Sequence, residues 1–213
     1  MKFKSYIFLL LSLNVLISNE ISEMDFVLGF WPEYDRHETL VMVQINIPEN
    51  QLPFRANLQI PESVDTVFVL GISHQDKSLN PFKTENSGNW NIVMDETNYY
   101  MQFYLPIEKI EQERHFDFIF NLDVPLNQYH IVIQEPLQSE NFTSNLENVE
   151  KVTDEFTLKY HRSHYKNYSA GESKNVHFHY SRNTVIPTLM LLEQIMADHS
   201  QFINPESEEP VIE

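Results

Sequence analysis

The sequence predicts an all-β protein: a two-sheet antiparallel β-sandwich, immunoglobulin-like or jelly-roll-like, with an N-terminal signal segment and a short C-terminal helix. Apolar residues fall at every second position in several stretches, which places them on one face of extended strands. Prolines and turn-forming residues separate these stretches. Long helical periodicity does not intervene between them, so the pattern favours two packed antiparallel sheets over a parallel α/β fold.

Residues 1–20 are typical of an export signal. Lys2 and Lys4 precede an apolar run over residues 6–17, which is the arrangement that export machinery recognises. Two polar residues interrupt the run, and it is shorter than the roughly 20 residues of a membrane-spanning helix. Leu16 stands where a small residue is expected before a cleavage site, so an uncleaved anchor remains an alternative. We expect export to the periplasm, the cell envelope or the extracellular space.

The β-sandwich domain is expected to cover residues 24–182. The expected strands are residues 39–47, 54–60, 66–73, 90–94, 99–105, 114–122 and 129–134, followed by two late strands at about 156–161 and 176–181. The first two are expected to be neighbours joined by a Pro-containing loop. The two late strands alternate most clearly and are separated by turn residues, so we expect them to form a hairpin.

Residues 183–213 change character. Apolar residues recur at helical spacing from Val185 onward, and Pro187 suits a first helical turn, so a helix is expected over residues 187–199. It is too short and too polar to span a bilayer. We expect it to cap one end of the sandwich, with binding to a partner or a membrane surface as the alternative. The acidic, Pro-containing segment 204–213 is expected to be disordered.

The composition excludes several classes of function. With 14 Lys and Arg residues against 31 Asp and Glu residues, the formal net charge is -17, so a nucleic-acid partner is not expected and an anionic membrane surface is repelled. The chain contains no cysteine, which rules out disulfides, thiolate metal sites and cysteine nucleophiles. The stability of the domain must therefore come from packing of its core.

The most distinctive motif is Trp31-Pro32-Glu33-Tyr34-Asp35-Arg36. Around it the sequence resembles a family of exported bacterial proteins of uncharacterised function, and the resemblance extends loosely to Ile60-Pro61 and the late strands. The resemblance implies a β-sandwich ectodomain, often tethered by a hydrophobic helix at one end, and it implies no catalytic residues. The C-terminal helix of this chain is too polar to span a membrane, so it departs from a C-terminally tethered pattern.

Histidines on the late strands are candidates for a metal site. If these strands form a hairpin, His161 lies opposite His177, and His179 shares the outward face of the same strand. Three imidazoles at this spacing can bind Zn²⁺ or Cu²⁺, with Glu172 or His164 as a further ligand. The alternative, which we favour, is a solvated sheet face that carries histidines without a metal.

The aromatic and charged residues of the distinctive motif are a second candidate. Trp31 and Tyr34, beside Phe30, Asp35 and Arg36, can stack on a sugar ring and hydrogen-bond its hydroxyls. The alternative, again favoured, is a structural corner in which Trp31 plugs one end of the core while Asp35 and Arg36 pair locally. The same two interpretations apply to three tyrosines: Tyr99, Tyr100 and Tyr104.

Motifs of common enzymes are missing from the sequence, including the Gly-x-Ser-x-Gly elbow, the phosphate-binding Gly loop and the His-Glu-x-x-His helix. Asp117 and Asp123, near His115, can form a hydrolytic pair, but chance neighbours are expected among 31 acidic residues. We therefore predict a protein that is not an enzyme, and we assign it no catalytic, cofactor-binding or metal-ligating residue.

The leading functional hypothesis is a non-catalytic extracytoplasmic interaction module that docks on an envelope protein or complex. Export, a sheet scaffold and an amphipathic C-terminal helix support it, and membrane contact is expected only through an uncleaved N-terminal segment. A carbohydrate- or metal-binding ectodomain and a hydrolase with paired carboxylates are the alternatives.

Overall fold

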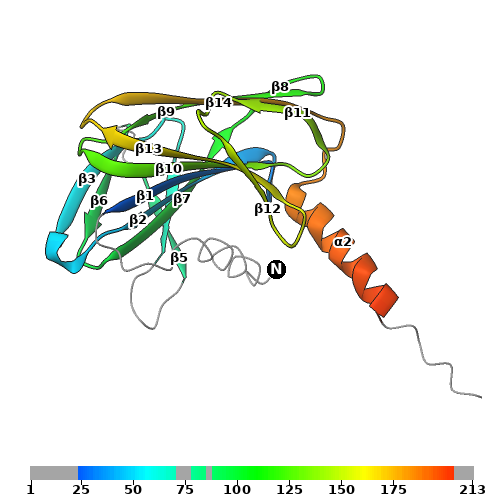
Figure 1. Cartoon of the computed structure of the whole chain (residues 1–213), viewed down its shortest axis with the longest axis horizontal. Helices are drawn as coiled ribbons and strands as arrows, with labels where there is room; N and C mark the ends of the chain where they lie inside the picture. Colours follow the sequence, from blue (N-terminus) through cyan, green and yellow to red (C-terminus); the bar gives the residue numbers. More distant parts are fainter. Residues whose placement is uncertain (1–23, 71–77, 85–87, 204–213) are drawn as a thin grey trace, which may run out of the picture.

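The computed structural model describes residues 24–70, 78–84 and 88–203, with side chains described up to Ala197. Over these residues the protein is mostly β, with several sheets and one short α-helix (Figure 1). The expected signal segment and the acidic tail from residue 204 onward lie outside the described residues. Among the described residues no helix is long and apolar enough to cross a membrane.

The elements follow the order expected from the alternating pattern, with additional short strands between them. The elements are β1 (Asp25–Pro32), β2 (Glu38–Asn46), η2 (Glu49–Gln51), β3 (Phe54–Gln59), β4 (Thr66–Leu70), β5 (Leu79–Lys83), β6 (Asn89–Met94), β7 (Asn98–Pro106), β8 (Glu108–Ile110), β9 (Glu113–Asn121), β10 (Leu126–Glu135), β11 (Ser139–Ser144), β12 (Glu150–Thr153), β13 (Lys159–Tyr168), β14 (Ser173–Arg182) and α2 (Thr188–Ile203). The expected helix thus begins one residue later than predicted, within the usual uncertainty of helix ends.

The strands form three sheets. An eight-stranded sheet has the order β12-β13-β10-β1-β2-β7-β4-β5, a four-stranded sheet the order β11-β14-β9-β8, and a two-stranded sheet pairs β3 with β6. Every strand pair is antiparallel except β1 with β10, which is parallel. An isolated bridge from Leu58 to Leu122 connects the two-stranded sheet to the chain just after β9.

Two predicted strand pairings are wrong. The chain does turn between β13 and β14, but β13 pairs with β10 and β12, whereas β14 pairs with β9 and β11. The expected late hairpin therefore does not form, because the turn carries the chain from one sheet to another. Likewise β2 pairs with β1 and β7, whereas β3 pairs with β6, so these two strands are not neighbours.

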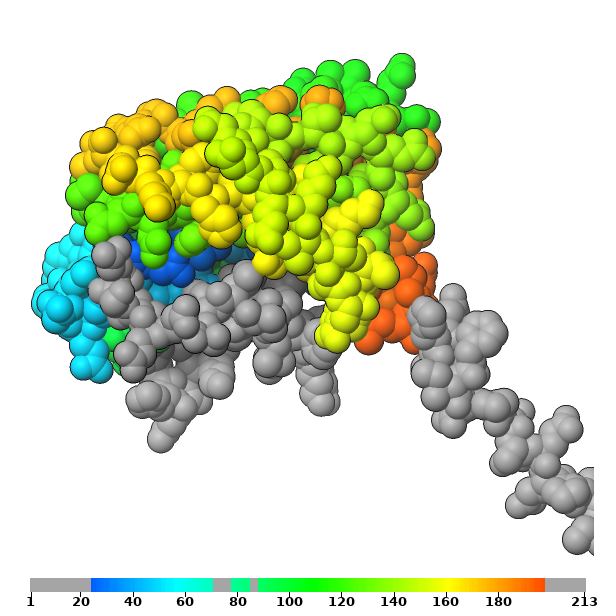
Figure 2. All heavy atoms as spheres, viewed as in Figure 1, coloured from blue at the N-terminus to red at the C-terminus, as the bar shows by residue number. Residues whose placement is uncertain are grey.

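The helix α2 leaves the sheets at an angle, and its C-terminal half extends away from every labelled strand (Figure 1). In the space-filling view its first turns, in orange, lie against the yellow segment that leads into β13 (Figure 2). Leu192 of the helix and Leu158 of that segment belong to one hydrophobic cluster, which explains why the helix rests there. The helix is therefore held at its N-terminal end.

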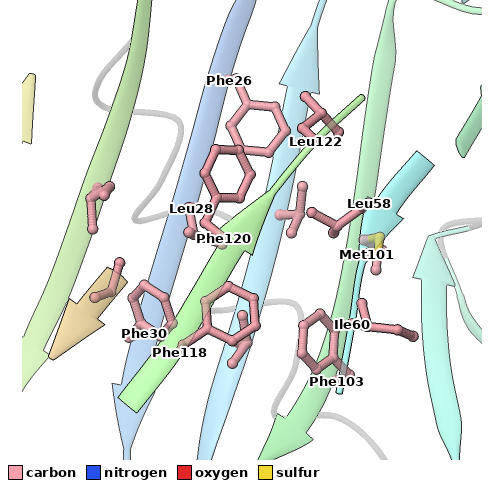
Figure 3. Close-up of a cluster of buried hydrophobic side chains, with 14 of the residues drawn as sticks. Phe26, Leu28, Phe30, Leu58, Ile60, Met101, Phe103, Phe118, Phe120 and Leu122 are labelled. Carbon is pink, nitrogen blue, oxygen red and sulfur yellow. The ribbon is translucent and has the colours of Figure 1, made fainter. Parts of the chain in front are cut away.

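The main hydrophobic core contains buried residues from all three sheets. Phe26 and Phe30 of β1 point toward Phe118 and Phe120 of β9 (Figure 3). The ring centroids of Phe26 and Phe120 are 5.2 Å apart, and those of Phe30 and Phe118 are 5.6 Å apart. Such tilted and edge-on aromatic pairs stabilise a core beyond the burial of their area.

A second hydrophobic cluster covers the opposite face of the eight-stranded sheet, called here its outer face. Its buried members are Trp31, Leu40, Met42, Tyr100, Val132, Leu158, Tyr160 and Leu192. Strands β1 and β2 are consequently buried on both faces, and their apolar residues run together instead of alternating. A Cβ at Gly29 would lie 2.0 Å from Cζ3 of Trp31, so glycine at this position leaves the room that the indole occupies.

Candidate functional site

The distinctive Trp-Pro-Glu-Tyr-Asp-Arg motif forms the end of β1 and the turn that leads to β2. We call the residues from Glu33 to Glu38 the Glu33 corner. The backbone N–H of Glu33 donates to the carbonyl of Glu38 at 2.9 Å, which closes the corner. Glu33 has a φ of 46°, a left-handed conformation that is uncommon outside glycine and is held here by the contacts of its side chain.

Glu33 is fully buried, with 0% of its surface exposed, and it is surrounded by cationic groups. Its Oε1 lies 3.1 Å from Nζ of Lys109 and 3.5 Å from Nε of Arg114. Its Oε2 lies 3.4 Å from Nη1 of Arg182 and accepts a hydrogen bond of 3.0 Å from the hydroxyl of Tyr180. One carboxylate therefore connects β1 with β8, β9 and β14.

The electrostatics of the corner favour an ionised Glu33. Burial by itself would raise the pKa of this carboxyl, but hydrogen bonds from Lys109 and Tyr180, together with the charges of Lys109 and Arg182, outweigh it and hold the pKa below the usual range. Burial and the nearby Glu33 charge raise the pKa of Tyr180, so its hydroxyl remains a donor. The corner is thus a buried ionic network centred on the Glu33 carboxylate.

The same corner receives the start of α2. The backbone N–H of Thr188 donates to the carbonyl of Glu33 at 2.9 Å, and that of Leu189 donates to the carbonyl of Tyr34 at 2.8 Å. These N–H groups lie in the first turn, where a helix has no carbonyl of its own to offer. Arg182 also donates from Nη2 to the carbonyl of Ile186 at 2.9 Å. The motif therefore anchors the C-terminal helix.

Beyond this anchor, α2 carries an apolar stripe that continues past the body of the protein. We call Leu191, Leu192, Ile195 and Met196 the α2 stripe, because the spacing of an α-helix places them on one side. Leu191 and Leu192 are 6% and 9% exposed, whereas Ile195 and Met196 are 40% and 46% exposed. The half of the stripe nearer the C-terminus therefore lies uncovered in solvent.

The structure does not place the aromatic candidates as a sugar-stacking surface. Trp31 is 2% exposed and lies in the outer-face cluster, with its ring centroid 6.4 Å from that of Tyr160. The guanidinium of Arg36 lies 3.5 Å above the centroid of the Tyr104 ring, whose hydroxyl donates to Asp35 at 2.8 Å. These residues form a structural corner, although Trp31 covers an outer sheet face and does not plug one end of the core.

The other tyrosines of the second candidate belong to two different clusters. Tyr99 lies in the main core and accepts a 2.9 Å hydrogen bond from Nε1 of Trp90. Tyr100 lies in the outer-face cluster and donates a 3.0 Å hydrogen bond to Gln102. Consecutive residues of one strand are both buried, because both faces of β7 are covered.

The three late histidines that we considered as a metal site, without favouring that interpretation, do not converge. His161 is buried on β13, where its Nε2 lies 3.1 Å from Oε2 of Glu135. His177 and His179 lie on β14 in the other sheet, where His177 contacts Asp117 and His179 contacts Thr143, each at 2.9 Å. The hydrogen bond from His161, followed by the hydrogen bond and charge of Lys159, holds the pKa of Glu135 below its usual range despite burial.

The two further ligands considered for that site also have other surroundings. Nδ1 of His164 contacts Nδ1 of His130 on β10. Glu172 accepts a 3.1 Å hydrogen bond from the backbone N–H of Ser169 in the turn after β13.

Asp117 and Asp123 do not form a hydrolytic pair. Asp117 lies on β9 beside His177, while Asp123 follows that strand and accepts two hydrogen bonds of 2.6 Å from Asn57. Six residues of extended chain separate two side chains by roughly 20 Å. His115 stacks on His179, with ring centroids 5.7 Å apart. No shared water or substrate atom can reach both carboxylates at that separation.

The sequence analysis included Glu33 in the distinctive motif but did not single out its partners, although a signal for the two arginines exists. Continuing the apolar row of Phe116 and Phe118 backward by two residues gives Arg114, and continuing the row of Phe178 and Tyr180 forward gives Arg182. Two arginines in core-facing positions require a buried anion. The identity of that anion depends on tertiary contacts.

Comparisons with known proteins add little to this picture. No family model and no curated protein matches the chain. Among solved structures, it is similar to an aminopeptidase A from Legionella pneumophila in complex with aspartic acid, with TM-score 0.35 and 10% identity over 75% of this chain and 21% of that chain. It is also similar to a candidate protease from Parabacteroides distasonis ATCC 8503, with TM-score 0.32 and 11% identity over 77% and 41% of the two chains.

This chain therefore spans about a fifth of the length of the Legionella pneumophila protein and about two fifths of the length of the Parabacteroides distasonis protein.

Proposed function

We propose that the protein is a non-catalytic, extracytoplasmic interaction module, in which a β-sandwich presents α2 to a groove on an envelope protein. The observation that carries the proposal is the α2 stripe. It is covered at Leu191 and Leu192 and uncovered at Ile195 and Met196. An amphipathic helix whose apolar side continues beyond its own domain is the ligand in helix-in-groove recognition.

The anchoring of the helix supports the same function. The corner carbonyls of Glu33 and Tyr34 accept the first helical N–H groups, and Glu33 is itself fixed by buried cations. A helix fixed at one end loses less conformational freedom on binding than a free peptide does. The corner therefore presents the stripe in a defined direction.

The charge of the chain defines the chemistry of the partner. The formal net charge is -17. Glu193, which lies between Leu192 and Ile195 in the sequence, is an exposed acidic residue of the same helix. A groove that fits this helix has an apolar floor for Ile195 and Met196 and a basic rim. We therefore infer a partner protein with a basic surface, and not a second copy of this acidic chain or an anionic membrane.

The test compares an Ile195→Ser, Met196→Ser variant with a Gln194→Ser control on the helix side away from the stripe. Each protein is immobilised and used to capture proteins from native membranes, and captured partners are then measured individually for affinity. We expect a partner that binds wild type and control, and binds the stripe variant at least about tenfold more weakly. Equal affinities for all three proteins would overturn the proposal.

Two further measurements test whether a second copy of the chain or a lipid membrane covers the stripe in place of a partner protein. Analytical ultracentrifugation shows whether the chain dimerises through the stripe, and flotation with anionic and neutral vesicles shows whether it binds lipid. A dimer that only the stripe variant abolishes, or stripe-dependent vesicle binding, would replace the partner protein with a second copy or a membrane and so overturn the proposal as stated.

A further inference from the structure

Two histidines face each other on the outer face of the eight-stranded sheet. His130 of β10 and His164 of β13 are directly paired in the strand register. Their ring centroids are 4.6 Å apart and the rings are nearly perpendicular, at 82°. The Nδ1 atoms of the two rings are in direct contact.

A carboxylate lies behind each ring, next to the other ring nitrogen. Nε2 of His130 lies 2.9 Å from Oδ1 of Asp25 on β1, and Nε2 of His164 lies 3.9 Å from Oε2 of Glu150 on β12. A negative oxygen opposite Nε2 favours the tautomer with its proton on that nitrogen. The Nδ1 atom of each ring, which carries a lone pair in this tautomer, then faces the Nδ1 atom of the other ring.

Two lone pairs directed at one point repel each other unless a proton or a cation lies between them. Histidines that bind metal ions have this arrangement, because the nitrogen that does not bind the ion usually donates to a carboxylate that orients the ring. Here each ring has a carboxylate oxygen near its Nε2 atom, at 2.9 Å for His130 and at 3.9 Å for His164. The four residues lie on strands that follow one another in the sheet in the order β12, β13, β10 and β1 (Figure 1).

We propose that His130 and His164 bind one divalent transition-metal ion through their Nδ1 atoms, with Asp25 and Glu150 as positioning residues. The site is reachable from solvent, since the side chain of His164 is 60% exposed and that of His130 is 24% exposed. The exposed ring of His164 has freedom to rotate and to widen the gap for an ion. The acidic surface of the chain raises the local concentration of cations.

The ligand set defines the class of ion. Imidazole nitrogen suits Cu²⁺, Zn²⁺ and Ni²⁺, whereas Ca²⁺ and Mg²⁺ require oxygen ligands. Among the described residues, no group of three or more His, Asp or Glu side chains could hold an ion, so water completes the coordination. The site is therefore open and of modest affinity, and it binds Cu²⁺ more tightly than Zn²⁺.

The test titrates Cu²⁺, Zn²⁺ and Ca²⁺ into the tag-free full chain by calorimetry, with electron paramagnetic resonance of the Cu²⁺ form. We expect one equivalent of Cu²⁺, coupling of its spectrum to two imidazole nitrogens, and no Ca²⁺ binding. In His130→Gln and His164→Gln the affinity falls at least about tenfold and one nitrogen coupling is lost.

The matched control is His177→Gln, His179→Gln, which removes two histidines from the outer face of the four-stranded sheet. The control keeps wild-type affinity if the proposal is right. Binding that is lost in the control but kept in His130→Gln and His164→Gln would overturn the proposal, as would a wild-type chain that binds neither Cu²⁺ nor Zn²⁺.

Asp25→Asn keeps both imidazoles and tests the positioning role. We expect it to weaken Cu²⁺ binding by about tenfold or more while both nitrogen couplings remain. Far-UV circular dichroism and melting temperatures of all variants separate lost binding from lost folding. Unchanged affinity in folded Asp25→Asn would overturn the assignment of Asp25.

Discussion

Replacing Glu33 by glutamine tests the buried ionic network that anchors α2. The change keeps the shape of the side chain but removes the negative charge. The guanidinium groups of Arg114 and Arg182, whose side chains are 6% and 0% exposed, then lose the carboxylate within 3.5 Å of each. Removing one partner of a buried ion pair costs about 3–5 kcal/mol.

The structure places the expected cost at the lower end of this range. Both arginines keep hydrogen bonds to backbone carbonyls: Arg114 to Glu111, and Arg182 to Leu137 and Ile186. Lys109, whose side chain is 37% exposed, can turn toward water. We therefore expect Glu33→Gln to lower the free energy of unfolding by about 3 kcal/mol at neutral pH, measured by urea denaturation monitored by circular dichroism.

The effect of Glu33→Gln should depend on pH in a defined direction. The folded-state pKa of Glu33 lies below the usual value of a glutamate, so the unfolded chain binds more protons at Glu33 than the folded chain in acid. The stabilising contribution is therefore fully present above that value and is lost as the pH falls through the folded pKa. The difference between wild type and variant should be constant near neutral pH and shrink in acid.

The control for this experiment is Glu38→Gln, which removes one partner of an exposed ion pair. Its carboxylate lies 3.6 Å from Arg36, and both side chains are more than 40% exposed. The expected change is within about 0.5 kcal/mol. A Glu33→Gln effect below about 1 kcal/mol, or one that is equally large in acid, would show that the ionised Glu33 carboxylate does not stabilise the folded protein.

Three more predictions concern packing. Gly29→Ala should destabilise the protein by about 1–3 kcal/mol in urea denaturation, because the new methyl group overlaps the Trp31 ring, and wild-type stability would show that the indole can move aside. Phe118→Ala should cost about 3–5 kcal/mol and Ile119→Ala less than about 1 kcal/mol, since these neighbours are 2% and 59% exposed; equal costs would contradict the strand register. In a Trp90→Phe variant the remaining Trp31 should resist acrylamide quenching, and strong quenching would restore it as a sugar-stacking candidate.

Several elements could be predicted from the sequence because their signal is local. Alternation in β9 and β14 identifies which residues face the core, and Phe116, Phe118 and Phe120 are all buried there. Helical spacing after Val185 predicts α2. These patterns arise from the repeat of a strand or helix, so a few consecutive residues contain the information.

Other elements could not be predicted, for two physical reasons. Strand β1 was missed because Trp31 and its neighbours are buried on both faces of a sheet, which removes the alternation by which a strand is recognised. The predicted pairing of β13 with β14 was wrong because the same turn residues can connect two strands of one sheet or two strands of different sheets. Turn chemistry does not distinguish these outcomes.

The spacing of apolar residues along the chain was enough to predict a mostly β protein with an amphipathic helix after its last strand. Tertiary structure alone decided that Glu33 meets Arg114 and Arg182, and that His130 meets His164 instead of His161 meeting His177. These pairs join residues that are far apart in the sequence. Their meeting depends on which sheet each strand enters, and that choice is made by packing of the whole core.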